Sequence, residues 1–178
     1  MNEKTTVRRI KSGEKELFAL LLRKYERIVN SVIYSMVFDI ENTKDLTQDA
    51  FIKAYENLNS YDEEQDFKPW IIKIARNSAI DFLRKRKSVV SIEELETEPG
   101  DEKSAKNEKD RLDREKIESV LLRLKEEERT LLLMKYKEGF SNSEIAQILE
   151  MPENRINVKL FRAKEKLREY FETENRKR

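Results

Sequence analysis

Two stretches of the sequence concentrate positively charged side chains, although the chain as a whole is balanced. Its 178 residues include 37 Lys and Arg against 36 Asp and Glu. Residues 71–87 carry six cations and one acid, and residues 153–168 carry six cations and two acids. Because clustered Lys and Arg neutralise phosphates, each stretch is a candidate surface for nucleic acid.

Aromatic residues accompany the first basic stretch. Tyr61, Phe67 and Trp70 precede it, and a basic surface beside exposed rings suits single-stranded nucleic acid, whose unpaired bases stack on aromatic faces. Trp70 and Phe82 fall on an apolar stripe, so we expect both in a core. Tyr61 and Phe67 lie in or beside a polar turn, where a core role and a base-stacking role are both open.

The second basic stretch has the proportions of a helix-turn-helix. A short helix after Ser141 or Asn142 is followed by a break at residues 150–152 and by a longer helix with a polar outer face. Near the start of the longer helix, side chains suited to reading base edges in a major groove are Asn154, Arg155, Asn157 and Lys159. The alternative is a solvated surface helix that ends in a basic tail.

The composition excludes several classes of enzyme. With no His and no Cys, the usual zinc site, the Ser-His-Asp triad, a cysteine nucleophile and a disulfide are impossible. The glycines Gly13, Gly100 and Gly139 stand alone, so no glycine-rich phosphate loop can form. The acids show no convergent spacing for a carboxylate nuclease. We therefore expect no catalytic residue, no metal site and no cofactor.

Helical periodicity recurs along the chain, and no strand pattern is present. We predict a first helix after Ser12, its N-cap, reaching Met36, and a second over residues 42–58, capped by Asn42 or Thr43, with an acidic exposed face. A third begins near Pro69 and ends in the basic run 84–87. The last helix should bury the apolar residues Ile156, Leu160, Phe161, Leu167 and Tyr170.

The helical segments predict an all-α fold of two small domains, residues 1–88 and 113–178. Residues 89–112 are rich in acids and poor in apolar side chains. Since ordering a backbone costs about 1 to 2 kcal/mol per residue, we expect a flexible acidic linker there. The longest apolar run, residues 17–22, is too short to span a membrane, so we expect no membrane insertion and an intracellular protein.

Two sets of motifs resemble bacterial sigma factors of the extracytoplasmic function (ECF) type, a group of the sigma-70 family. Region 2 of that family is similar to DLTQDAF at 45–51, FKPWI at 67–71, IARN at 74–77 and DFLRK at 81–85. Region 4 is similar to ER at 128–129, LLLMKY at 131–136, SEIA at 143–146, RA at 162–163 and LR at 167–168. Their order along the chain is the order in the family.

The resemblance implies a dissociable, non-enzymatic initiation subunit that directs core RNA polymerase to promoters. It implies docking on the coiled coil of the polymerase beta-prime subunit through Asp45, Gln48, Asp49 and Phe51, and a further contact with the beta flap. It also implies a cytoplasmic protein that is a monomer within the holoenzyme and nucleoid-associated there. An anti-sigma factor is a further candidate partner that the sequence leaves open.

The resemblance also assigns DNA contacts to both units. In region 2, the melted minus-ten strand would be held by Tyr61, Phe67, Lys73, Arg76, Asn77, Arg84 and Lys85, with a flipped base in the loop 59–68. In region 4, the minus-thirty-five duplex would be read by Asn154, Arg155, Asn157, Val158, Lys159 and Arg162. The acidic linker would thread the nucleic-acid channel of the polymerase.

The chain departs from its relatives at the helix-turn-helix, where many have Gly at the positions of Glu150 and Asn154. A non-Gly residue in a left-handed turn costs about 1 kcal/mol, which we expect the turn to absorb. Arg155, Asn157 and Val158 also differ from common residues there, so a relative's promoter preference does not transfer. Two other classes stay open: a free-standing helix-turn-helix regulator and a helical protein-binding adaptor.

Overall fold

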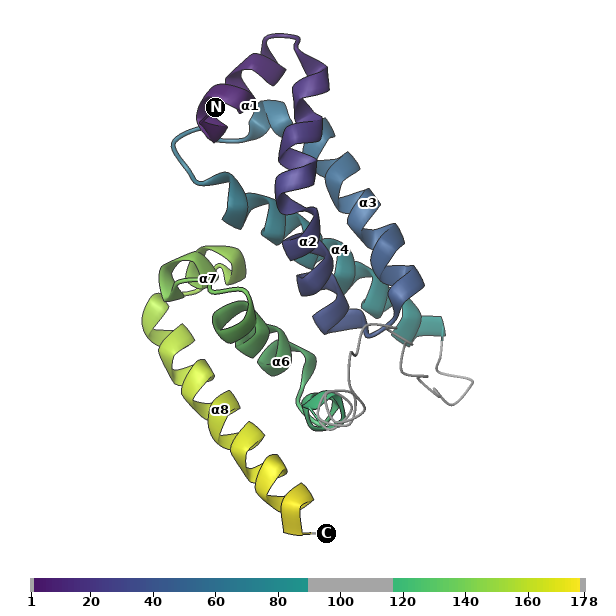
Figure 1. The fold of residues 1–178 in the computed structure, drawn as a ribbon, viewed down its shortest axis with the longest axis vertical. Coiled ribbons are helices and arrows are strands. Elements are labelled where there is room, and N and C mark those ends of the chain that lie inside the picture. Colours follow the sequence, from purple (N-terminus) through teal and green to yellow (C-terminus); the bar gives the residue numbers. More distant parts are fainter. Residues whose placement is uncertain (1, 90–116, 177–178) are drawn as a thin grey trace, which may run out of the picture. The chain divides into compact units, whose positions relative to one another are not determined.

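The computed structural model describes residues 2–89 and 117–176, and all regular structure in those ranges is helical (Figure 1). The chain divides into two compact units, residues 1–98 and 99–178. The predicted all-α fold of two helical units is confirmed. Nearly all of the predicted linker, residues 90–112, lies outside the described residues, and the domain limits stay predictions.

The first unit is built on three helices that pack against one another. They are α2 (Phe18–Val37), α3 (Ile40–Glu56) and α4 (Phe67–Val89). Each contributes one apolar stripe to a common core, in which Val29, Ile33, Ala50, Ile71 and Ala75 have no exposed surface. A short 3-10 helix, η2 (Leu58–Ser60), follows α3 and begins the connection to α4.

A helix that the sequence pattern did not predict precedes the bundle. α1 (Glu3–Lys11) begins at Asn2, whose side chain accepts a hydrogen bond from the backbone N–H of Lys4. Val7 and Ile10 attach α1 to the core. Ser12 is therefore the C-cap of α1, and its prediction as an N-cap is wrong. The chain then turns and passes through a 3-10 helix, η1 (Lys15–Leu17), into α2.

The predicted cap of the next helix is also wrong. α3 begins at Ile40, and its N-cap is Asp39, whose carboxylate accepts a hydrogen bond of 2.8 Å from the backbone N–H of Asn42. That backbone hydrogen bond is the main reason why the pKa of Asp39 lies below its ordinary value. Thr43 is buried, and its hydroxyl donates to the Asp39 carbonyl. Asp39 thus accepts hydrogen bonds at the N-terminus of α3 through both its side chain and its backbone carbonyl.

The second unit consists of a helical segment at 117–122 and the helices that follow. They are α6 (Glu126–Leu132), the π-helix η3 (Leu133–Lys137), α7 (Asn142–Leu149) and α8 (Glu153–Arg176). Leu131, Met134, Ile145 and Ile156 form a buried core. Phe161 is 67% exposed, so its predicted place in the core is wrong.

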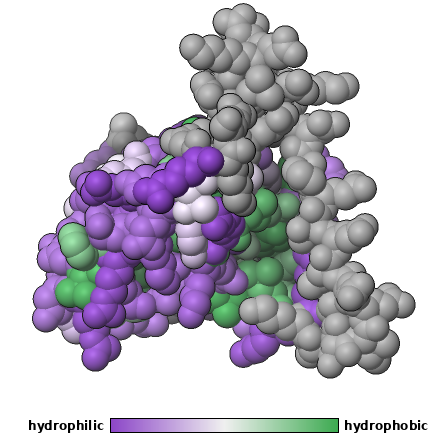
Figure 2. Space-filling model, turned by 90° about the horizontal axis from the view of Figure 1, so that it is seen from below, coloured by the Kyte–Doolittle hydropathy of each residue, from purple (hydrophilic) through white to green (hydrophobic). Residues whose placement is uncertain are grey.

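Among the residues coloured in Figure 2, hydrophilic side chains are the most common, with apolar areas between them. This agrees with a chain in which 41% of residues are charged. Across residues 2–89 and 117–176, none of the helices combines the length and the apolar character needed to cross a membrane.

α7 and α8 form the helix-turn-helix. Ser141 caps α7 by accepting a hydrogen bond from the N–H of Glu144, whose carboxylate in return accepts from the N–H of Ser141. At the other end, Glu150 adopts φ 51°, and the N–H of Met151 donates to the Ala146 carbonyl. A non-Gly residue therefore occupies the left-handed position of this turn, as the sequence suggested.

Replacing Glu150 with Gly should raise the free energy of unfolding of the second unit by about 1 kcal/mol, because Gly adopts this backbone without the steric cost of a Cβ atom. Urea unfolding followed by circular dichroism measures the change. Gln147→Gly, at an exposed site inside α7, is the matched control and should lower the same quantity by about 1 kcal/mol. Equal effects of the two substitutions would contradict the role assigned to Glu150.

Candidate functional site

The basic stretch of the first unit lies along the outer side of α4. Lys73, Asn77 and Arg84 recur at intervals of four and seven, so they share one helix face, with Arg76 beside them. Asn77 and Arg84 are exposed, whereas Lys73 and Arg76 are half-buried. Arg84 pairs with Asp81 at 3.0 Å, but both side chains remain more than half exposed. Such a pair costs little to open, so Arg84 stays available to a phosphate.

Lys85 is exposed as well. It follows Arg84 directly and therefore lies about 100° further round the helix than the face just described. The predicted strand contacts on α4 thus form one face, with Lys85 at its edge.

The aromatic residues before α4 form a packed cluster. Phe67 lies 5.4 Å from Tyr25, 5.5 Å from Tyr61 and 5.3 Å from Trp70 between ring centroids. Tyr61 and Phe67 are 4% and 1% exposed, so neither offers a ring face to a base. The two are therefore corrected from strand contacts to core residues. Trp70, expected in the core, is half-buried and is the ring of this cluster that solvent reaches most.

Burial also affects the hydrogen bonding and the pKa of Tyr61. Its hydroxyl donates to the Gln65 carbonyl at 2.5 Å, which folds the turn 62–66 back over the start of α4. Burial, assisted by the nearby carboxylates of Asp66 and Glu3, raises the pKa of Tyr61 to about 12. The phenol keeps its proton well into the alkaline range, and its hydroxyl donates to the turn.

The predicted polymerase-binding residues divide into surface and core. Asp45, Gln48 and Asp49 are exposed on one side of α3. Phe51 is 4% exposed and packs in the bundle, and its polymerase contact stays a prediction. Two apolar residues of α3 that the sequence analysis did not single out as contacts, Ile52 and Tyr55, are 55% and 37% exposed.

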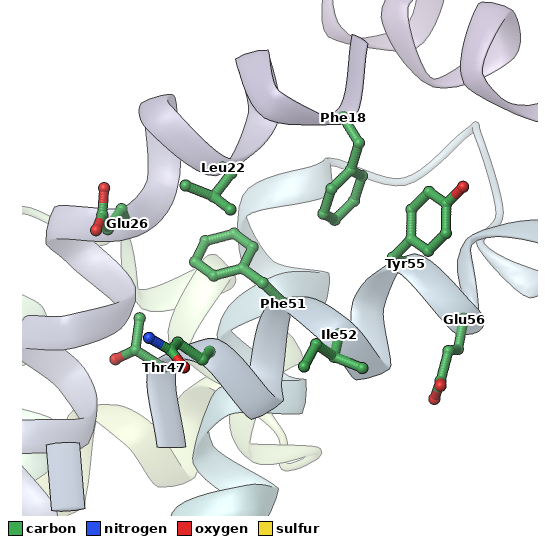
Figure 3. A pocket seen from close by; sticks show the side chains of 9 residues that line it. Phe18, Leu22, Glu26, Thr47, Phe51, Ile52, Tyr55 and Glu56 are labelled. Carbon is green, nitrogen blue, oxygen red and sulfur yellow. The ribbon is translucent and has the colours of Figure 1, made fainter. Parts of the chain in front are cut away.

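A groove of about 610 Å³ lies between α2 and α3. Figure 3 shows Phe18 and Leu22 of α2 opposite Phe51 and Ile52 of α3. Its other lining residues are Glu26, Thr47, Gln48, Tyr55 and Glu56. The buried hydroxyl of Thr47 has no hydrogen-bond partner among the described residues. An apolar groove with acids at its margin, next to Asp45 and Gln48, is suited to bind another protein.

The outer side of α8 carries most of the predicted duplex contacts. Asn154, Arg155, Asn157, Val158 and Arg162 are all exposed. Phe161, which the sequence analysis assigned to the core, is exposed on the same side as Val158 and Arg162. A helical wheel detects this, because Phe161 lies about 100° from the buried Leu160 and away from the core stripe.

Lys159 differs from the other predicted contacts. Its ammonium forms an ion pair of 2.6 Å with Glu127 of α6, and the neighbouring Lys166 pairs with Glu128. Lys159 is therefore half-buried and directed to α6 in this structure, and its DNA contact stays a prediction.

Comparison with protein families accounts for both units. Residues 21–89 match Sigma-70 region 2, and residues 114–167 match Sigma-70 region 4. The chain belongs to the ECF group of sigma-70 factors. The region 2 match covers nearly all of α2, together with α3 and α4, while α1 lies outside it. The region 4 match contains the helix-turn-helix.

Individual sigma factors agree with this assignment. The chain is 32% identical over 170 residues to the RNA polymerase sigma-H factor of Pseudomonas aeruginosa, covering 89% of this chain and 88% of the relative. It is 28% identical to the ECF RNA polymerase sigma factor SigW of Bacillus subtilis, covering 93% and 94%. The solved sigma factor RpoE of Bartonella quintana, in complex with the anti-sigma factor NepR, has the same fold, with a TM-score of 0.69, 22% identity and coverage of 87% and 96%.

Two ion pairs between α6 and α8 hold α8 against the rest of its unit. Burial raises the pKa of Glu128, but hydrogen bonds from Lys166 and from the backbone N–H of Lys125 outweigh burial, and the net pKa lies below its ordinary value of 4.5. A carboxyl whose pKa is lowered by folding contributes stability above its unfolded pKa, and that contribution is lost as the pH falls through the folded value.

Glu128→Gln should therefore lower the free energy of unfolding at pH 7 and have no effect once the pH is well below 4.5, because the wild-type carboxyl is then protonated too. Gln still accepts from the N–H of Lys125, so the substitution isolates the charge. Urea unfolding at a series of pH values measures the difference. Glu165→Gln, on the exposed side of α8, should show no such dependence. A penalty that persisted unchanged in acid would contradict the ion-pair explanation.

Proposed function

We propose that this sigma factor binds core RNA polymerase through α3 and presents two DNA surfaces, α4 for a melted strand and α8 for intact duplex. The observation that carries the proposal is that exposed or half-buried cations line α4 and exposed cations lie on α8, while an acidic face of α3 carries none of the predicted DNA contacts. A free-standing duplex-binding regulator would leave the α3 and α4 surfaces without a role.

The polymerase contact is proposed for Asp45, Gln48 and Asp49, with the coiled coil of the beta-prime subunit as their partner. Region 4 would contact the beta flap. Exposed Ile52 and Tyr55 and the adjoining groove extend the α3 surface with apolar area, which gives protein interfaces much of their energy. In this arrangement the chain is a single copy within the holoenzyme and performs no catalysis itself.

An anti-sigma factor is proposed as a competing partner. The similar RpoE of Bartonella quintana was solved with one, NepR. The same α3 surface and groove would suit such a protein, because a partner that covers them also blocks the polymerase. The factor would act in the cytoplasm, where its polymerase and promoters are, and would be nucleoid-associated in the holoenzyme.

On DNA, Lys73, Arg76, Arg84 and Lys85 would neutralise the phosphates of the unpaired minus-ten strand, and Asn77 would reach a base edge. The half-buried Trp70 is a better candidate for stacking than Tyr61 or Phe67, because part of its surface is open. At the minus-thirty-five duplex, Arg155, Asn154 and Asn157 would donate to base edges. Val158 and Phe161 would contact thymine methyl groups.

Replacing both Asp45 and Gln48 with Ala should weaken binding to core polymerase by about tenfold, which corresponds to about 1.4 kcal/mol, since two exposed polar contacts are lost. Fluorescence titration of labelled factor with core enzyme measures the affinity. Glu16→Ala, an exposed acid outside α3, is the control and should leave the affinity unchanged. Undiminished capture of the double variant would mean that the docking surface lies elsewhere.

Arg155→Ala should reduce discrimination at one position of the minus-thirty-five duplex by about 1 to 3 kcal/mol, the value of a bidentate arginine–guanine contact. Selection of duplexes from a randomised library with reconstituted holoenzyme gives the base preference at each position. Lys159→Ala is the comparison variant, since Lys159 is paired with Glu127, and it should leave every base preference in place. Identical selected sequences from wild type and Arg155→Ala would remove Arg155 from the reading surface.

A further inference from the structure

The turn between η2 and α4 presents an electrostatic conflict. It contains four carboxylates within five residues, Asp62, Glu63, Glu64 and Asp66. The turn leads directly into α4, where the proposed function brings an unpaired DNA strand. At ordinary ionic strength, charges repel one another over about 10 Å, so uncompensated acids at this place would oppose the phosphates.

α1 supplies cations to this turn. Arg8 Nε lies 2.6 Å from one carboxylate oxygen of Glu63, Lys11 Nζ lies 3.3 Å from the other, and Lys4 Nζ lies 3.7 Å from Glu64. The side chains of Lys11 and Glu63 are only 21% and 25% exposed, so their pair is shielded from solvent better than most surface pairs. The hydrogen bond from Arg8 is the main reason why the pKa of Glu63 lies below its ordinary value.

α1 also holds the backbone of the turn. Lys11 Nζ donates to the Tyr61 carbonyl at 2.8 Å. The ring of the same tyrosine packs on Trp70 at 4.9 Å and on Phe67 at 5.5 Å. One ammonium group therefore connects α1 to the residue from which the turn departs, and that residue is packed on the first turn of α4.

The other end of α1 is anchored to the bundle, so the helix can serve as a fixed support. Glu3 accepts a hydrogen bond of 2.5 Å from the hydroxyl of Tyr25 and another from Lys24. The Tyr25 ring lies 5.4 Å from Phe67, in the aromatic cluster below the turn. Figure 1 shows α1 at the end of the bundle where α3 gives way to α4, and α1 contacts η2 there.

We propose that α1 is a brace for the turn 62–66, which neutralises its acids and fixes its position so that an unpaired DNA strand can approach α4. Arg8 and Lys11 are positioning residues in this inference, which rests on the proposed function of α4. The residues matched to Sigma-70 region 2 begin at 21, so α1 precedes the matched segment.

The test removes both cations that pair with Glu63, through the double substitution Arg8→Gln, Lys11→Gln in the full chain. Wild-type and variant holoenzymes are reconstituted with core polymerase and exposed to a randomised single-stranded DNA pool and to a randomised duplex pool. The amount of single-stranded DNA that the holoenzyme retains, after subtraction of the amount retained by core enzyme alone, should fall by about threefold to tenfold in the variant. This is the loss expected from two surface ion pairs. Retention of duplex, which depends on α8, should be unchanged.

Two further variants distinguish the loss of the α1 brace from a general loss of positive charge. Arg9→Gln with Lys15→Gln removes two cations next to the same segment, and Arg9 pairs with Glu14. This control should retain the wild-type amount of strand. The charge swap Arg8→Glu with Glu63→Arg is made together with Lys11→Gln, because Lys11 would otherwise repel the new cation, and it restores one pair in reverse. It should retain strand better than the Arg8→Gln, Lys11→Gln variant.

Equal strand retention by wild type and the Arg8→Gln, Lys11→Gln variant would overturn the brace, as would an equal loss in the Arg9→Gln, Lys15→Gln control. A charge swap as defective as the double Gln variant would mean that Arg8 contacts DNA directly, and would also overturn it. If the wild-type holoenzyme retained no strand above core enzyme, the proposed function of α4 would fail and the brace with it. That result can be distinguished from the others because it is seen with the wild-type protein, before any substitution is made.

Discussion

Burial of a single apolar stripe on each helix decides which side chains of this sigma factor are available to other molecules. α2, α3 and α4 each direct one stripe to a shared core, in which residues such as Ile33, Ala50 and Ile71 lose all contact with water. Since the apolar positions recur with the helical period, the charged positions between them must face outward. The cations of α4 and the acids of α3 thereby become separate surfaces of one small bundle. No motif of catalytic chemistry is needed for this, only the period of the helix.

Ion pairing with carboxylates divides the cations of α8 into two groups, paired and unpaired within the described residues. On α8, Lys159 and Lys166 pair with Glu127 and Glu128 of α6 and hold the helix against its own unit. Arg155 and Arg162 form no ion pair with the described residues and stay exposed. A count of positive residues along the sequence treats all four alike. Ion pairing separates them, because the four lie within about 60° of one another around the helix and the two lysines reach carboxylates of α6. Structural and nucleic-acid roles can therefore alternate along one basic stretch.

Most of the framework could be predicted from sequence, and the failures have identifiable physical causes. Long apolar stripes specify α2, α3 and α4 because many apolar positions in each fall on the same side of the helix. α1 buries only two apolar residues, Val7 and Ile10, which are too few to reveal a helical period in the sequence. Phe161 follows Leu160, and when two apolar residues are adjacent, hydrophobicity alone does not say which one faces the core. Tyr61 and Phe67 were ambiguous because the residues beside them are polar; their burial depends on Tyr25 and Trp70, contacts formed between different helices.

The two proposed DNA surfaces differ in the way their chemistry would discriminate nucleic acid. α8 offers amide, guanidinium and apolar groups from an exposed helix face, and intact duplex presents its base edges in a groove of fixed width. α4 offers cations with a partly open Trp70 at its start, and an unpaired strand has no such groove, so its bases must be fixed by stacking and its phosphates by charge. Strand binding therefore depends more on the geometry of the surrounding turn than duplex reading does. The turn before α4 is correspondingly tied down by the Tyr61 hydroxyl, by the aromatic cluster and by α1, whereas the outer face of α8 is presented by a single regular helix.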